Sequence, residues 1–166
     1  MVARLLVVAM TGLVLVGCSK GTSSSTNARP PGHARLIVDG KPSHICVAIA
    51  RTAREQETGL MNVRALPKNE GMAFVLSGKP NVSFWMKDTF VPLVVVWVAD
   101  GGAVLGAADM APQDLTPHPT PGPVALGIEL SPGDWAPFRD RAKTIELGAD
   151  CQARITARGG GPSTRF

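Results

Sequence analysis

The sequence has no block of basic residues, few aromatic residues and only three histidines. Its 17 lysines and arginines are scattered among 13 acidic residues, which gives a formal net charge of +4, and aromatic residues make up 5% of the chain. Nucleic-acid-binding domains gather basic and aromatic side chains on one face, so the sequence predicts no nucleic-acid partner. The histidines (His33, His44 and His118) form no ligand set at metal spacing and no catalytic motif, and we expect neither a metal site nor a cofactor.

The sequence also lacks an apolar run that would span a membrane comfortably. Its longest, Leu5–Val16, is interrupted twice and is shorter than the about 20 residues that a span needs. With Arg4 before it, residues 1–17 have the pattern of a signal peptide. The run ends in Leu-Val-Gly-Cys18, which resembles a bacterial lipobox. We therefore predict lipidation of Cys18, the alternative being an ordinary secretory leader with a chance cysteine.

The remaining sequence divides by composition. Residues 18–33 are rich in serine, glycine and proline and predict a flexible tether. Residues 34–157 predict a single β-rich domain, and residues 158–166 a disordered tail. The predicted location is the cell envelope, on the outer side of the cytoplasmic membrane or in the periplasm, with the lipid on Cys18 holding the chain to the membrane.

Two cysteines, Cys46 and Cys151, remain in the predicted domain. Outside the cytoplasm a leftover pair suggests a disulfide. Cys46 lies in the first long strand pattern and Cys151 near the last, where the ends of a domain often meet. The alternative is two unpaired buried thiols.

Most of the domain has the alternating apolar pattern of β-strands, with one capped helix. The helix is predicted at 52–58, because Thr52 and Glu55 form a capping-box pattern and Gly59 suits the C-cap. The apolar run 93–99 predicts a central strand that is covered on both faces. The predicted strands are 34–38, 43–50, 72–76, 82–86, 93–99, 103–108, 124–130, 145–147 and 153–155, with a single helical turn at 134–138 and an irregular proline-rich loop at 112–123.

The segment 84–87 (Phe-Trp-Met-Lys) carries the central structural prediction. Alternate residues of a strand point to opposite faces, and an unpaired lysine does not face a dry core. We therefore expect Phe84 and Met86 in the core, and Trp85 and Lys87 on a groove or in solvent. By the same alternation Glu129 leaves its strand on the face opposite Ile128 and Leu130, away from the core.

Six short motifs, in order along the chain, resemble those of domain-of-unknown-function family 192. Phe84-Trp85-Met86-Lys87-Asp88-Thr89 is the most specific. The others are Gly59-Leu60-Met61, Gly71-Met72-Ala73-Phe74, Pro92-Leu93, Met110-Ala111-Pro112 and Ile128-Glu129-Leu130. The resemblance implies an α+β, mostly β fold, a compact barrel-like mixed sheet with one or two short helices, and no established activity.

The chain departs from the family pattern at three positions. Gln56 stands where an arginine is usual, Arg64 is displaced by one position, and Val94 replaces a usual aspartate. If that aspartate serves chemistry in relatives, this chain lacks it.

The preferred functional hypothesis is a ligand-binding groove for a small sugar-like or anionic molecule, or for an envelope partner. Trp85 would form a stacking platform beside the polar side chains of Lys87, Asp88, Thr89 and Glu129. The structural alternative is that Lys87 and Glu129 form an ion pair between strands and Trp85 only packs.

Two further hypotheses remain open. The methionines Met61, Met72, Met86 and Met110 all lie in the family motifs, and thioethers prefer Cu(I); the alternative is that they fill the core. Asp88 and Glu129 could also act as the paired carboxylates of a hydrolase, which requires a particular separation.

Overall fold

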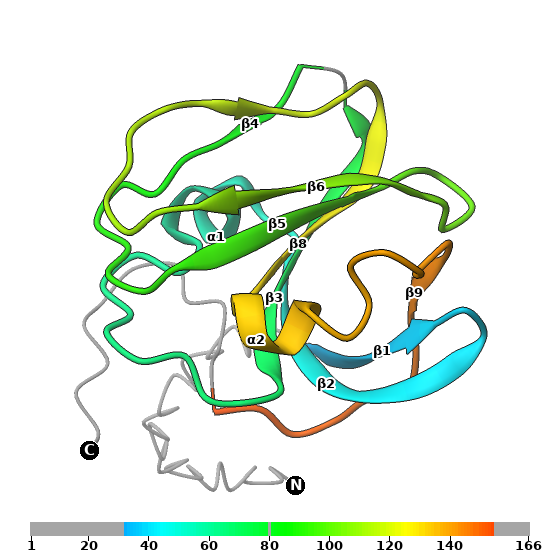
Figure 1. The fold of residues 1–166 in the computed structure, drawn as a ribbon. Coiled ribbons are helices and arrows are strands. Elements are labelled where there is room, and N and C mark those ends of the chain that lie inside the picture. The colour runs from blue at the N-terminus through cyan, green and yellow to red at the C-terminus, as the bar shows by residue number, and fades with distance from the viewer. Residues whose placement is uncertain (1–31, 80, 155–166) are drawn as a thin grey trace, which may run out of the picture.

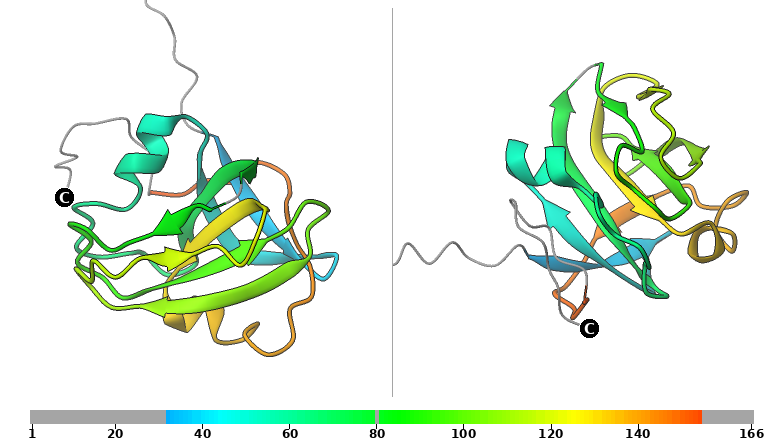
Figure 2. Two further views of the ribbon diagram at one scale, coloured as in Figure 1. Left: turned by 90° about the horizontal axis from the view of Figure 1, so that it is seen from above. Right: turned by 90° about the vertical axis from the view of Figure 1, so that its left-hand side faces the viewer.

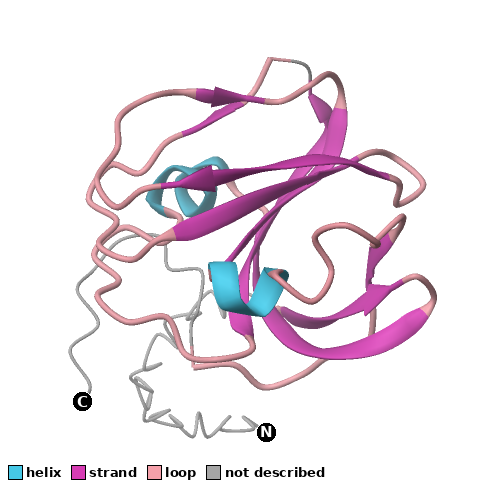
Figure 3. Cartoon of the chain, in the orientation of Figure 1, coloured by secondary structure: helices cyan, strands magenta, loops and turns pink. Residues whose placement is uncertain are grey.

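The computed structural model describes residues 32–79 and 81–154, which form a curled β-sheet with two short helices (Figures 1 and 3). The predicted signal peptide, Cys18, most of the predicted tether and the predicted C-terminal tail lie outside these residues. The elements in chain order are β1 (His33–Val38), β2 (Lys41–Ala50), α1 (Ala53–Thr58), β3 (Glu70–Lys79), β4 (Ser83–Phe84), β5 (Leu93–Val98), β6 (Val104–Met110), β7 (His118–Pro119), β8 (Val124–Leu130), α2 (Pro132–Trp135) and β9 (Ile145–Leu147).

The main sheet has seven strands in the order β6-β5-β8-β3-β2-β1-β9, and its only parallel pair is β2 with β3. The sheet curls until its two edges approach, and a bridge joins Ala103 to Thr144 beside them. The amide N of Val104 donates to the carbonyl O of Lys143 at 2.9 Å in the same place. The predicted barrel-like α+β fold is confirmed, although the sheet does not close along the full length of its edges.

Both faces of the sheet are covered by apolar packing. One buried cluster draws on both ends of the sheet (Leu36, Val96 and Ile145 among others) and includes Trp135 of α2. The second cluster lies on the opposite face and includes Met72, Phe84 and Val95. Figure 2 shows α1 and α2 on opposite sides of the sheet. The central strand β5 is therefore buried on both faces, as its continuous apolar run predicts.

Helix α1 begins where the sequence predicts. The backbone N of Glu55 donates to Oγ1 of Thr52 at 3.2 Å, and the N of Thr52 donates to Oε2 of Glu55 at 2.8 Å, which completes the capping box. Gly59 ends the helix with φ +45°, and its amide N donates to the carbonyl O of Glu55. The helix is thus fixed at both ends, which also places the residues that follow it.

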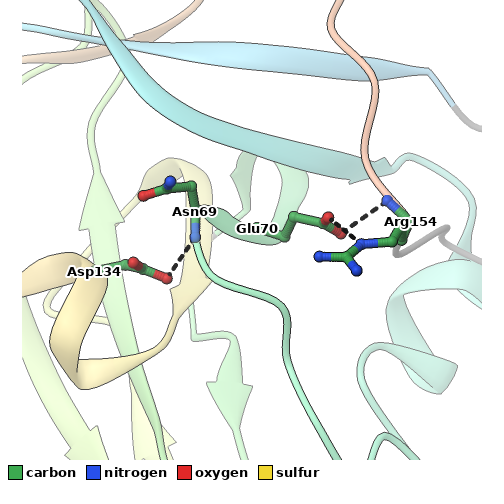
Figure 4. Close-up of polar contacts among 4 residues, drawn as sticks. All are labelled: Asn69, Glu70, Asp134 and Arg154. Carbon is green, nitrogen blue, oxygen red and sulfur yellow. Dashed lines mark hydrogen bonds and ion pairs between the residues drawn. The ribbon is translucent and has the colours of Figure 1, made fainter.

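Cys46 of β2 and Cys151 form the predicted disulfide, with their Cα atoms 6.0 Å apart. Close by, Glu70 accepts hydrogen bonds from the backbone N and the Nε of Arg154, at 2.8 and 3.2 Å (Figure 4). The amide N of Asn69 donates to Oδ2 of Asp134 at 3.0 Å in the same view. The start of β3 therefore holds both the C-terminal segment and helix α2.

Several predicted boundaries are wrong. The helical turn expected at 134–138 is α2 at Pro132–Trp135, because Oγ of Ser131 accepts a hydrogen bond from the N of Asp134 and so starts the helix earlier. The strand expected at 82–86 is shortened to Ser83–Phe84, because the chain enters a turn in which the N of Thr89 donates to the O of Met86 at 3.1 Å. The loop at 112–123 contains the short strand β7, which pairs with β4. Residues 153–154 form no strand, since Arg154 is bonded to Glu70 instead. The predicted tether at 18–33 includes His33, but His33 is the first residue of β1 and pairs with Ala48 of β2.

Candidate functional site

The segment from β4 to Thr89 presents its side chains alternately, as predicted. Phe84 and Met86 are buried, whereas Trp85 is 52% exposed and Lys87 is exposed. β4 is held by antiparallel pairing with β7, in which Phe84 lies opposite His118. The turn after it is tight, with Asp88 at φ +53°. These contacts fix the indole and the lysine on the outer side of the segment.

A pocket of about 100 Å3 lies between this segment and the end of helix α1. Four of the five predicted ligand-binding residues line it: Trp85, Lys87, Thr89 and Glu129. Asp88 does not line it and is exposed. The other lining residues are Gln56, Glu57, Thr58, Gly59, Leu60, Met61, Phe74, Leu76, Val82, Ser83 and Phe84.

Glu129 is the unusual residue of this pocket. It lies on β8, in register with Met72 of β3 and Val95 of β5, and only 5% of it is exposed. Within residues 32–79 and 81–154 no hydrogen bond or ion pair reaches its carboxyl group. Burial alone raises the pKa of this carboxyl group to about 8, so Glu129 is mostly protonated and neutral at pH 7.

The expectation that Glu129 lies on a face away from the core is wrong. The alternation along β8 correctly separates Glu129 from Ile128 and Leu130, but both faces of the sheet are covered here. Glu129 lies on the face of the sheet that carries the apolar cluster of Met72, Phe84 and Val95. The alternation within one strand predicts which side chains share a face. It does not predict whether that face is buried, because the segments that cover it are distant in the sequence.

Lys87 and Glu129 form no ion pair, so this part of the structural alternative is also wrong within the described residues. Oγ1 of Thr89 donates to the backbone O of Lys87 at 3.2 Å, which holds the turn. Nε2 of Gln56 donates to the carbonyl O of Val75 at 2.7 Å and ties helix α1 to β3. Gln56, which replaces the arginine usual in the family, therefore places a neutral side chain in the pocket wall.

Sequence reasoning missed the aromatic wall of the pocket. The rings of Phe74 and Phe84 meet edge to face, with centroids 5.3 Å apart and planes at 85°. Gly127 makes room for this arrangement, because a Cβ atom there would overlap the Phe84 ring. Phe74 and Phe84 both lie in the family motifs, but their pattern predicts core residues only. Their role as walls of the pocket depends on the end of α1, which lines the same pocket.

The two remaining hypotheses gain no support from the geometry. Met72, Met86 and Met110 are fully buried in the apolar cluster, where packing accounts for them, and only Met61 lines the pocket. No group of histidine, cysteine or acidic side chains suited to a metal occurs in the described part of the chain. Since Asp88 lies outside the pocket, the pair of Asp88 and Glu129 is not assembled there.

The fold and the pocket define a small α+β domain with a curled mixed sheet and one buried acid beside an exposed indole. Residues 34–139 match the model of domain-of-unknown-function family 192 (DUF192), described as "Uncharacterized ACR", and the chain belongs to this family. No helix in the described ranges is both long and apolar enough to cross a membrane.

Two solved structures are similar to this chain. One, from Sinorhizobium meliloti 1021, is a protein proposed to be a transcription regulator, with 27% sequence identity and a TM-score of 0.61 over 70% of this chain and 92% of that one. The other, from Novosphingobium aromaticivorans DSM 12444, is a protein of unknown function, with 28% identity and a TM-score of 0.60 over 69% of this chain and 84% of that one. No curated protein matches the chain.

Proposed function

We propose that this DUF192 protein is a lipid-anchored extracytoplasmic domain that binds a small ligand in the pocket beside Trp85. The observation that carries the proposal is that Glu129 of β8 lines one pocket together with Trp85, Lys87 and Thr89, which lie about 40 positions earlier in the chain. A concave site with aromatic walls and a few polar groups is the usual form of a small-molecule site. An envelope protein that inserts one side chain into the pocket is the second form of the same proposal.

Of the two ligand classes predicted from the sequence, the pocket favours the sugar-like one. An anion would lie close to Glu129 and would be repelled whenever that residue ionises. A protonated Glu129 instead donates a hydrogen bond, the carbonyl group of Gln56 and the hydroxyl group of Thr89 can accept hydrogen bonds, and the indole offers a flat apolar face. These groups suit a hydroxylated ring better than a phosphate or a carboxylate.

Removal of the exposed indole or of the lysine side chain should strongly weaken ligand binding without unfolding the protein. We expect Trp85→Ala and Lys87→Ala to weaken the binding of a monosaccharide at least about tenfold, because each removes a contact at the mouth of the pocket. Both side chains are exposed, so the melting temperature should stay within a few degrees. Calorimetric titration with glucose, galactose, mannose and N-acetylglucosamine, and with acetate and phosphate, measures the affinity.

Leu105→Ala and Lys41→Ala are matched controls, since both residues are exposed and neither lines the pocket. They should leave the affinity unchanged. Binding of acetate or phosphate but of no sugar would select the anionic ligand class instead. If Trp85→Ala and Lys87→Ala unfold the protein, the two residues are structural and the proposal fails.

The anchor is a separate part of the proposal. The disulfide between Cys46 and Cys151 supports a location outside the cytoplasm, where such bonds persist. Cys18→Ser should move the protein from the membrane fraction to the soluble fraction and remove the incorporation of labelled palmitate in a bacterial host. Cys46→Ser is the control and should keep the label. Labelling that survives Cys18→Ser would show that Cys18 is not the lipidated residue.

A further inference from the structure

The pocket contains a buried acid without a counter-charge. Glu129 is 5% exposed, and no side chain in the described ranges donates a hydrogen bond to it or pairs with it. Two other charged residues line the pocket, Glu57 from α1 and Lys87 from the segment after β4, and neither forms an ion pair with Glu129. The strands beside Glu129 present the apolar side chains of Met72 and Val95. An acid in such a place lacks the partner that buried charges normally have.

Aromatic rings are the second feature of the site. Phe74 and Phe84 meet edge to face, and the half-exposed indole of Trp85 lies on the same pocket. The faces of aromatic rings attract cations, most strongly those of tryptophan, and groups of such rings recognise alkylammonium ligands. Rings and a carboxylate together are selective for a cation over a neutral molecule of the same shape.

We propose that this pocket binds the ammonium group of a small organic cation, with Glu129 as its counter-ion and Phe74, Phe84 and Trp85 around it. The inference rests on the proposed function, since it assumes that the pocket takes a ligand. It narrows the sugar-like class to a sugar that carries a protonated amine, because such a ligand can stack on Trp85 while its ammonium group reaches Glu129.

The size of the pocket fits a head group. Drug-sized ligands occupy sites of about 300–1,000 Å3, whereas this pocket measures about 100 Å3. A whole sugar ring is therefore not enclosed. The ammonium group and its nearest carbons would enter, and the rest of the ligand would lie at the mouth against Trp85 and Lys87, which are both exposed.

Binding of a cation should release a proton. The pKa of Glu129 is raised to about 8 by burial, so the empty pocket holds a neutral carboxylic acid at pH 7. When an ammonium group enters, the O–H bond of Glu129 breaks, the proton leaves to solvent, and the carboxylate remains as the partner of the cation. The ammonium group keeps all of its own protons, and no other reactant is needed.

The test uses the full-length protein and tetramethylammonium chloride, whose charge is the same at every pH. We expect calorimetric titration at pH 7, repeated in buffers of different ionisation enthalpy, to show release of close to one proton per bound cation. The affinity should rise on the order of 100-fold between pH 6 and pH 9, because ionisation of Glu129 no longer opposes binding at the higher pH. The neutral analogue 2,2-dimethylpropan-1-ol, which has the same branched shape with one added hydroxyl group, should bind weakly and release no proton.

Glu129→Gln keeps the shape of the side chain and should remove both the proton release and the pH dependence of tetramethylammonium binding. Glu146→Gln, an exposed glutamate on β9, is the matched control and should change neither. If Glu129→Gln does not fold, the proton release of the unmodified protein still decides. Equal binding of the cation and its neutral analogue, or cation binding without proton release, would overturn the inference.

Glucose and glucosamine separate this inference from the proposed function. If glucosamine binds at least tenfold more tightly than glucose at pH 7, both the proposed function and the ammonium inference are supported. If glucose binds as well as glucosamine, the pocket is a sugar site and the ammonium inference fails. If no sugar and no ammonium compound binds, both fail.

Discussion

Replacement of Cys46 and Cys151 by alanine should lower the free energy of unfolding by about 2–5 kcal/mol. The bond joins residues that are 105 positions apart, and a cross-link over a long loop removes much of the conformational freedom of the unfolded chain. It attaches the C-terminal segment, which follows β9, to β2 in the main sheet. Urea titrations of the oxidised protein and of the double variant measure the difference.

Two controls separate the effect of the disulfide on stability from the effect of local contacts of the C-terminal segment. Arg154→Ala removes the contact of the same segment with Glu70, and we expect a loss below about 1 kcal/mol because the arginine side chain is 80% exposed. Reduction of the unmodified protein with dithiothreitol should lower its stability to nearly that of the double variant. If the reductant changes nothing, the two cysteines are not bonded in solution.

Local signals in the sequence predict the elements well. The capping box at Thr52 and Glu55, the apolar run of β5 and the alternation in β8 each depend on residues close in the chain. The disulfide could also be predicted, because two cysteines remain in a domain for which the sequence predicts a location outside the cytoplasm, where cysteine pairs usually form disulfides. The shortened strand at 82–86 was missed because its end is set by a turn at Asp88 and by pairing with β7.

The site was predicted in part, for the same reason. The parity of residues 84–87 correctly places Trp85 and Lys87 outside and Phe84 and Met86 inside. Whether the face of the sheet that carries Glu129 is buried or exposed to solvent depends on α1 and on the β4–β7 pair, which are distant in the sequence. The ring pair of Phe74 and Phe84 likewise forms only when β3 and β4 are brought together, so no local pattern reports it.

The cost of burying Glu129 should appear as a decrease in stability with rising pH. In the folded protein its pKa is raised from 4.5 to about 8, so the folded state binds more protons than the unfolded state between these values. The free energy of unfolding should therefore fall as the pH rises through this window, by up to about 5 kcal/mol. Below the window both states are protonated, and above it both are ionised, so the loss is complete above about pH 8.

Glu129→Gln removes this slope, and its comparison with the unmodified protein isolates the single group. Hydrogen bonds lower the pKa of the carboxyl groups of Asp39, Glu55, Asp109 and Asp114 from their ordinary values, so these groups change their protonation at pH values below this window. Urea titrations at pH 5, 7 and 9 should show the variant gaining on the unmodified protein by several kcal/mol, while Glu146→Gln follows the unmodified protein throughout. If the stabilities of the Glu129→Gln variant and of the unmodified protein change with pH in the same way, the carboxyl group is solvated or paired.

A cation in the pocket should flatten the same slope, since it stabilises the ionised form of Glu129 and so lowers the cost of keeping that charge in the folded protein.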